Sequence, residues 1–331
     1  MGETLHLLQV ARRIEHDIVL RDRADVVLRG LEKEPLMDGL YETPMSNRFH
    51  AEGPTVRSHL RLMLMSLFAI LDGKIHLLEI EEFARLKGMG EEIQEMEQML
   101  TENPATFEVF CLIHDVGKQF KVFVDDQDHI HYHGHAKEIY RPEIRDLLYR
   151  LAAQYKLEDR DVEMIVPLVA FHLEPLHRFR TSAHKKDVEL IAKLGAKQGQ
   201  DSDDFMNMLQ AAILLDQVFG SREVVGEKIT TDANHLVNFL IAEREYAPWK
   251  LAQKEAARAL ERKRSLHKVL VEAKLDGHGM MQLTGMKPGR ELGDLLKKIQ
   301  AAVLEEGELP KEASAWKDEL ARRLLLARAR L

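Results

Sequence analysis

Apolar residues recur along this chain at the three- and four-residue spacing of amphipathic helices, and the period-two alternation of strands is nearly absent. The pattern predicts helices at about residues 3–30, 55–73, 78–87, 90–101, 106–117, 136–155, 160–173, 204–219, 230–245, 248–274, 290–305 and 311–330. Only residues 123–132 are compatible with a short hairpin, whose turn would lie at 125–129. We therefore predict an all-α fold.

Four of these helices carry a histidine or an aspartate in line with their apolar residues. The i, i+3, i+4, i+7 spacing joins Val56, His59, Leu60 and Met63; Phe107, Phe110, Cys111 and His114; Ile165, Leu168, Val169 and His172; and Leu209, Ala212, Ile213 and Asp216. Asp115 follows His114 directly. A buried carboxylate is costly unless it is paired or bound to a cation. The pattern therefore predicts a buried metal site.

A single histidine on an apolar stripe is more often a hydrogen-bonded core residue than a metal ligand, so this prediction depends on the four stripes together. The chain also contains a second His-Asp pair, His16-Asp17, which follows the charged segment 12–15. We interpret that pair as part of a solvated helix face. His114-Asp115 differs because it ends an apolar run and is followed by Val-Gly-Lys.

Length and composition indicate a cytoplasmic protein of two packed units. The chain has 331 residues, of which 45% are hydrophobic and 31% charged, with a formal net charge of −8. Its one cysteine, Cys111, allows no internal disulfide, as is usual in a reducing compartment. The first residues are charged too early for a secretory signal. The most apolar stretch, 60–71, is too short to span a bilayer, so we expect no membrane association.

Five segments in order carry a resemblance to a known family: HLRLML at 59–64, CLIHDVGK at 111–118, YHGHAKEI at 132–139, IVPLVAFH at 165–172 and LLDQVFGSR at 214–222. Together they resemble the successive motifs of the HD superfamily of metal-dependent phosphohydrolases. FHAEGPTVRSH at 49–59 is similar to the HD domain of bacterial CCA-adding tRNA nucleotidyltransferases. Residues 276–309 resemble the C-terminal tail of those enzymes, whose nucleotidyltransferase head has no counterpart in this sequence.

The resemblance implies an N-terminal helical segment at 1–45, an HD phosphohydrolase domain at 46–247 and a helical tail domain at 248–331. It also implies a metal site. His59, His114, Asp115 and Asp216 would hold a first metal, and Asp115 would bridge to a second metal held by His135 and His172. Nitrogen and oxygen ligands without thiolate suit Mn²⁺, Mg²⁺, Ni²⁺, Co²⁺ or Fe, as one or two ions.

Several roles stay open at this point. His135 and His172 are either metal ligands or donors to a phosphate, with His135 then acting as a general acid. Lys118 is placed to reach a phosphate, or it is a cation at a helix C-terminus. His50 and Glu52 either border the site or cap the helix that begins near Thr55.

The function implied is hydrolysis of phosphate esters of nucleotides or RNA ends, including 2′,3′-cyclic phosphates, by attack of metal-bound hydroxide, with Asp115, Lys118 and His135 as catalytic residues. Alternatives are a non-catalytic RNA-binding or tRNA-processing accessory protein, and a nucleotide triphosphohydrolase or signalling-nucleotide hydrolase. Residues 250–300 contain twelve Lys or Arg against six Asp or Glu. This basic segment, with Trp249, either contacts RNA or packs as an amphipathic helix.

Overall fold

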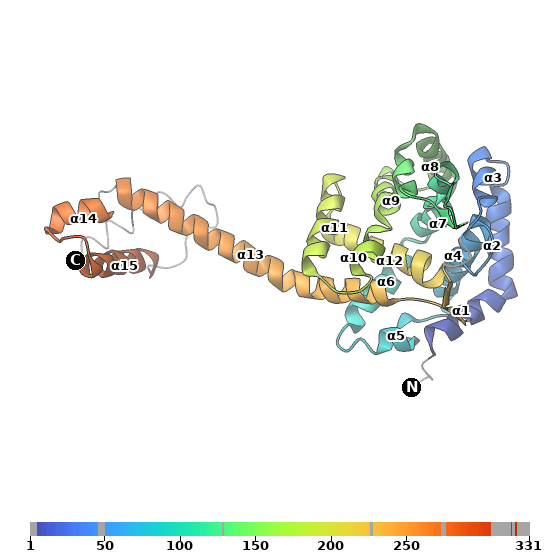
Figure 1. Cartoon of the computed structure of the whole chain (residues 1–331), viewed down its shortest axis with the longest axis horizontal. Helices are drawn as coiled ribbons and strands as arrows, with labels where there is room; N and C mark the ends of the chain where they lie inside the picture. Colours follow the sequence, from blue (N-terminus) through green and yellow to red (C-terminus); the bar gives the residue numbers. More distant parts are fainter. Residues whose placement is uncertain are drawn as a thin grey trace. The chain divides into compact units, whose positions relative to one another are not determined.

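The computed structural model describes residues 5–45, 50–127, 129–225, 228–272 and 276–305, together with Glu319 and Arg322 (Figure 1). The chain divides into two compact units, Met1–Tyr246 and Ala247–Leu331. The described residues are mostly helical, and their strands form only two short antiparallel hairpins. The predicted all-α fold is confirmed. The assignment of the parts of the chain to an HD domain and a tail domain stays a prediction.

The first half of the first unit contains α1 (Leu7–His16), α2 (Ile18–Gly30), α3 (Pro35–Tyr41), α4 (Val56–Leu71), η1 (Leu77–Glu79), α5 (Glu81–Ala84), α6 (Gly90–Glu102), α7 (Pro104–Ile113) and η2 (Val116–Phe120). It continues with β1 (Phe123–Val124), β2 (Ile130–His131), η3 (His135–Tyr140), α8 (Pro142–Tyr155), α9 (Asp159–Phe171), α10 (Glu174–Phe179), α11 (Lys185–Lys197), α12 (Ser202–Ile213), the π-helix η4 (Leu214–Phe219), β3 (Glu223–Val225) and β4 (Lys228–Thr230). The last helices are α13 (Asn234–Glu272), which runs through the boundary between the units, α14 (Gly277–Thr284) and α15 (Arg290–Glu305).

Several predicted boundaries are corrected. The helix expected at 3–30 is two helices, because the Asp17 side chain accepts a hydrogen bond from Leu20 N and so begins α2. The helices expected at 230–245 and 248–274 are one, since good helix formers on both sides continue α13 through Pro248. The sequence pattern missed α3, α10, α11 and α14.

The predicted hairpin at 123–132 is confirmed, with Phe123 opposite His131 and Val124 opposite Ile130. The hairpin β3–β4 was not predicted. The helix expected at 311–330 lies outside the described residues, apart from Glu319 and Arg322. Among the described residues, no helix has both the length and the apolar character needed to cross a membrane.

The core of the first unit is built around α4, which is buried along most of its length. This helix packs against α7 and the π-helix η4, while α7 packs against α9 and α9 against α12. These inner helices are the ones whose apolar stripes carry His59, His114, His172 and Asp216. Packing their apolar faces together therefore directs the polar residues on those faces toward one another.

Candidate metal centre

The structure brings all six predicted metal ligands together. His59 lies in the first turn of α4, His114 directly follows α7, and His172 directly follows α9. The other three lie on neighbouring segments: Asp115 before η2, His135 at the start of η3 and Asp216 in the π-helix η4. All six are buried, with exposed fractions of 0% to 6%.

Two glycines allow these segments to approach closely. A Cβ atom on Gly117 would lie 2.0 Å from the backbone oxygen of His135, so only glycine permits η2 and η3 to meet here. A Cβ atom on Gly220 would lie 2.6 Å from Cγ of Met63, on α4. Gly117, which comes two residues after Asp115, is therefore required for the close packing of η2 against η3. The π-helix that precedes Gly220 is a form often found at functional sites.

The first group of potential ligands consists of His59, His114 and Asp216. Nε2 of His59 lies 3.1 Å from Oδ1 of Asp216 and 3.3 Å from Nε2 of His114. Nε2 of His114 lies 3.5 Å from the same Asp216 oxygen. The three ligand atoms converge on one point and can be reached by one cation.

The second group consists of Asp115, His135 and His172, whose ligand atoms all lie within 4.8 Å of one another. Oδ1 of Asp115 is 3.1 Å from Nε2 of His135. Its other oxygen, Oδ2, is 3.3 Å from Nε2 of His114 and 3.7 Å from Nε2 of His59. Asp115 therefore lies between the two groups, with one oxygen near each.

The four imidazoles share one hydrogen-bonding arrangement. Each Nδ1 lies near a backbone carbonyl oxygen: His59 with Gly220 (2.9 Å), His114 with Cys111 (3.1 Å), His135 with Tyr132 (2.9 Å) and His172 with Val169 (2.7 Å). A carbonyl oxygen only accepts, so each Nδ1 carries the hydrogen and donates it. Each Nε2 is then the nitrogen that can bind a metal, as is typical of histidine ligands held by an outer hydrogen bond.

The charges in the cluster keep its carboxylates ionised. Burial acts to raise the pKa of Asp115, but His114 and Lys118 outweigh it and hold that pKa well below its usual range. Burial acts likewise on Asp216, whose pKa is held low by His114 and His59. Burial lowers the pKa of His172 to about 3, so this imidazole is neutral. Ionised carboxylates and neutral imidazoles are the forms that bind metals.

His59 shows the opposite shift. Burial acts to lower its pKa, but hydrogen bonds to Asp216 and Glu52 outweigh burial and raise the pKa to about 10. The two carboxylates thus attract positive charge to this imidazole. A divalent cation on Nε2 would supply that charge in place of the proton.

The residues present suit a divalent cation. Oδ2 of Asp115 and Nε2 of His135 are buried, and neither has a hydrogen-bond partner among the described residues. Nζ of Lys118 lies 2.7 Å from Oδ2 of Asp115 as an ion pair, without the direction of a hydrogen bond. Leaving a buried polar atom unpaired costs about 1–3 kcal/mol. Cations bound to these two atoms, one in each group, would remove that cost.

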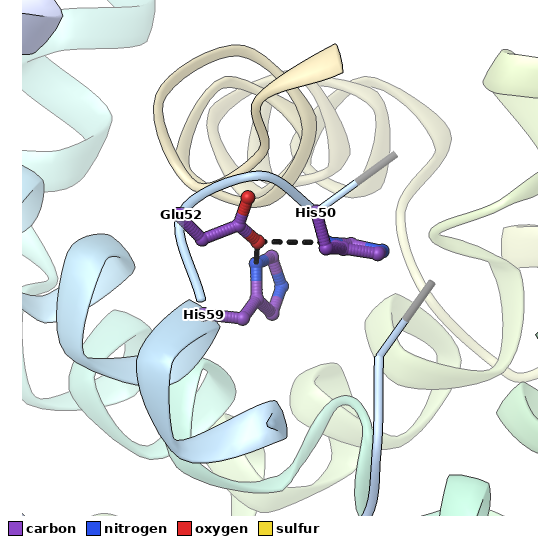
Figure 2. A group of neighbouring side chains, drawn as sticks. All are labelled: His50, Glu52 and His59. Atoms are coloured by element: carbon purple, nitrogen blue, oxygen red, sulfur yellow. Dashed lines mark hydrogen bonds and ion pairs between the residues drawn. The ribbon is translucent and has the colours of Figure 1, made fainter. Parts of the chain in front are cut away.

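Glu52 supports the cluster from behind His59 (Figure 2). Its Oε1 atom lies 2.7 Å from Nδ1 of His50 and 3.4 Å from Nδ1 of His59, and its Oε2 atom accepts a hydrogen bond from Arg222 N at 3.1 Å. Burial acts to raise the pKa of Glu52, but the hydrogen bonds from the two histidines lower it to about 2. No side chain caps the start of α4. His50 and Glu52 therefore border the cluster and do not cap that helix.

The three residues His50, Glu52 and His59 could themselves be considered as a metal site, because their ligand atoms are close together. The hydrogen bonds argue against this. Nδ1 of His59 is already within 2.9 Å of the Gly220 carbonyl oxygen and carries a hydrogen, so it offers no lone pair to a cation. We interpret the group as a support that orients His59.

The cluster opens onto a cavity of about 500 Å³, within the range of ligand-binding sites. Four of the six predicted ligands lie on its wall, namely Asp115, His135, His172 and Asp216, and so do Lys118 and His50.

 The other two ligands, His59 and His114, lie behind this wall and do not line the cavity. The buried cluster is thus accessible from one side to a molecule in this cavity.

Lys118 was predicted to reach a phosphate, with a position at a helix C-terminus as the alternative. The structure places it in η2, 6% exposed, on the wall of the cavity and paired with Asp115. Its Nζ atom also lies 5.3 Å from the centre of the Tyr132 ring. Contact with a phosphate stays a prediction, and it requires only a small shift of Nζ away from Asp115.

Sequence reasoning missed several residues on the wall of this cavity. His235, on α13, is 3% exposed, and neither of its ring nitrogens has a hydrogen-bond partner among the described residues. His235, Phe239 and Ala242 follow i, i+4, i+7, so His235 lies in line with apolar residues of its helix. The same spacing pointed to His59 and His114, and it would have found His235. His131 and His133 also line the cavity.

In comparisons with known proteins, the chain matches no protein-family model, no curated protein and no solved structure.

Proposed function

We propose that this protein is a metal-dependent phosphohydrolase of the HD type, acting on phosphate esters of nucleotides or RNA ends. One observation carries the proposal: six buried metal-competent side chains converge in two groups around Asp115, beside a cavity of about 500 Å³. The ordered motifs that resemble the HD superfamily support it independently, because they supply the same six residues.

In this proposal His59, His114 and Asp216 hold one cation, His135 and His172 hold a second, and Asp115 contacts both. A bound divalent cation lowers the pKa of a coordinated water and neutralises charge on phosphoryl oxygens. The backbone carbonyls behind the four imidazoles keep each Nε2 directed at the cations. These hydrogen bonds fix the geometry before a substrate arrives.

Two further side chains act on the phosphate of the substrate. Lys118 exchanges its ion pair with Asp115 for a phosphoryl oxygen once the Asp115 carboxylate is engaged by cations. His235 offers a buried ring nitrogen to the leaving group or to a phosphoryl oxygen, since no described residue pairs with it. A cavity of this volume accepts a mononucleotide or the end of an RNA chain, including a 2′,3′-cyclic phosphate.

The proposal is tested by metal analysis combined with a panel of phosphate esters. Protein stripped with a chelator is reloaded with Mn²⁺, Mg²⁺, Ni²⁺, Co²⁺ or Fe²⁺ and offered 2′,3′-cyclic AMP, 3′-AMP, 5′-AMP and a deoxynucleoside triphosphate. We expect tight binding of one or two ions and metal-dependent hydrolysis of a monoester or cyclic ester. Metal binding without hydrolysis of any ester would favour a non-catalytic RNA-binding protein, and hydrolysis of the triphosphate alone would favour a triphosphohydrolase.

We also propose that the basic segment 250–300 contacts RNA. The described side chains Arg264, Lys268 and Lys287 are exposed in the second unit, while those of Arg262 and Lys263 lie outside the described residues. Charge reversal at Arg264 and Lys268 should weaken RNA binding and flatten its salt dependence, because fewer counterions are released. An unchanged slope of log K against log salt would leave amphipathic packing as the explanation.

A further inference from the structure

A second cavity, of about 490 Å³, lies in the first unit beside α1, α2 and α4. Four arginines line it, namely Arg12, Arg21, Arg61 and Arg222, together with three carboxylates (Glu15, Asp25 and Glu52) and apolar side chains that include Leu8 and Leu62. None of the six predicted metal ligands lies on its wall. Its volume is that of a site for a small molecule, and its four arginines outnumber its three carboxylates in a chain whose net charge is −8.

One face of α4 separates this cavity from the metal centre. Ser58, Arg61, Leu62 and Met65 line the arginine cavity and follow i, i+3, i+4, i+7, so they form one stripe of the helix. His59 lies outside that stripe and contributes to the metal centre. Glu52 lines the arginine cavity and also lies 3.4 Å from Nδ1 of His59. The two cavities are therefore distinct sites.

Arg222 is the most unusual of the four arginines, because it is only 2% exposed. Its Nε donates to Glu15 at 2.6 Å, and its Nη1 donates to the backbone oxygens of Phe219 and Ser221, each at 2.8 Å. Its Nη2 has no hydrogen-bond partner among the described residues. A buried guanidinium with unused N–H groups is costly, and an added acceptor would relieve that cost.

The other arginines leave positive charge at the same cavity. Arg61 is paired with Asp25 at 2.6 Å. Arg21 donates to the backbone oxygen of Glu15, and neither Arg12 nor Arg21 forms an ion pair with a carboxylate in the part of the chain that the structure describes. Arg12 and Arg21 are exposed on the wall of the cavity and can therefore turn toward an incoming anion.

We propose that the arginine cavity binds an organic phosphate monoester of about the size of a nucleoside monophosphate. The planar fork of a guanidinium matches the oxygens of a phosphate, so Arg12 and Arg21 hold the phosphate and Arg222 supplies charge beneath it. Leu62 and Met65 on α4 form an apolar wall for the organic part of the ligand. This site does not depend on the proposed hydrolysis at the metal centre.

The test measures binding of AMP to the full chain by isothermal titration calorimetry, in a chelator that prevents metal-dependent turnover. Adenosine, which lacks the phosphate, should bind at least about tenfold more weakly than AMP. The double variant Arg12→Gln/Arg21→Gln should weaken AMP binding by about tenfold or more, since two charged donors are lost. The matched control Arg29→Gln/Arg160→Gln removes two exposed arginines that lie outside the cavity, and it should leave the affinity unchanged.

Two results would overturn the proposal. One is the absence of measurable AMP binding to the wild-type chain. The other is AMP binding that Arg12→Gln/Arg21→Gln leaves unchanged but Lys118→Gln weakens, because the nucleotide would then occupy the metal-centre cavity. The exposed positions of Arg12 and Arg21 keep folding out of the comparison, and circular dichroism of each variant verifies this.

Discussion

The chain contains two His-Asp pairs that occupy very different environments. His114 and Asp115 are almost fully buried and face three more imidazoles and a second carboxylate. His16 is exposed at the end of α1, where its Nδ1 lies 2.6 Å from the Arg12 carbonyl oxygen. Asp17 begins α2 by accepting from Leu20 N and pairs with Lys74 at 2.7 Å. The same dipeptide is thus a helix junction in one place and the middle of a candidate metal centre in the other.

The difference shows which property marks the site. The pKa of Asp17 is lowered by the hydrogen bond to Lys74 and by Leu20 N, and the pKa of Asp115 is also lowered. A lowered pKa therefore does not separate the two aspartates. What separates them is burial together with several converging metal-competent groups. Asp17 lies near the surface and is paired there with Leu20 N and Lys74. Asp115 retains an oxygen without a hydrogen-bond partner among the described residues.

The largest expected effect is on metal binding and hydrolysis when the buried aspartate is changed. Asp115→Asn keeps the shape of the side chain but removes the charge that both cations share. Activity should fall well below about one hundredth of wild type, since loss of even an outer partner of a ligand costs about 10–100-fold. Asp17→Asn is the matched control and should keep full metal content and activity. If Asp115→Asn and Asp17→Asn had the same metal content and the same activity, the proposed difference between the two His-Asp pairs would be wrong.

The next effect concerns the second group of ligands. His172→Ala should remove one of two bound ions and leave the ion held by His59, His114 and Asp216, with a sharp drop in activity. His177→Ala, which alters an exposed histidine on the wall of the same cavity, should keep both ions. Metal stoichiometry by mass spectrometry decides between roles: an unchanged count in His172→Ala would make His172 a donor to phosphate.

A smaller effect is expected at Glu52, which orients His59 without a place in either group. Glu52→Gln should lower metal affinity about 10–100-fold, as for other carboxylates behind a histidine ligand. The pair His76–Glu97 provides the control. Nδ1 of His76 lies 3.0 Å from Oε1 of Glu97, so the contact is of the same kind. His76 is exposed, and both residues are distant in sequence from every proposed ligand. Glu97→Gln should leave the metal affinity at its wild-type value. Titration of the stripped protein with Mn²⁺ measures both.

The smallest effect concerns Glu243, a half-buried carboxylate on α13 that pairs with an amide instead of an imidazole. Burial raises the pKa of Glu243 to about 7, and the hydrogen bond from Gln210 only partly offsets this. As pH rises from about 4.5 to 7, the unfolded chain loses this proton before the folded protein does, so stability falls over that window. Glu243→Gln should therefore raise the free energy of unfolding above pH 7, by on the order of 2 kcal/mol, and have little effect below about pH 4.5.

Thermal unfolding of Glu243→Gln across pH 4 to 8 measures this difference. Glu245→Gln changes an exposed carboxylate on the same helix and should show no such pH dependence. A constant gain at every pH would show that the variant acts by packing and that the pKa of Glu243 is the same in the folded and the unfolded protein. The pKa values of Glu243 and Asp115 would then no longer be shifted in opposite directions.

The sequence predicted the parts of the site that lie on regular helices. His59, His114, His172 and Asp216 fall on apolar stripes, and the inner helices that carry them pack together as the periodicity requires. His135 has no such stripe and entered only through the family resemblance, because it begins a short 3₁₀ helix. The missed helices α3 and α10 each begin near a proline and are short, so periodicity over one or two turns is weak.

Contacts between distant segments were beyond the reach of sequence patterns. Nothing in the local sequence indicates that Arg222 is buried. It is buried through its pairing with Glu15, which is distant in the chain. Glu52 meets His59 only because the loop before α4 folds back on that helix (Figure 2). His131, at the end of β2, and His133, just before η3, line the cavity beside ligands from distant helices. Such placements follow from tertiary packing and not from local spacing.

The central claim is that the buried cluster around Asp115 holds divalent cations, and anomalous diffraction from crystals grown with Mn²⁺ tests it most directly. We predict anomalous peaks at about 2.0–2.3 Å from Nε2 of His59 and His114 and from Oδ1 of Asp216, with a second peak beside His135 and His172. A map with Mn²⁺ bound elsewhere on the protein and no peak in this cluster would contradict the account.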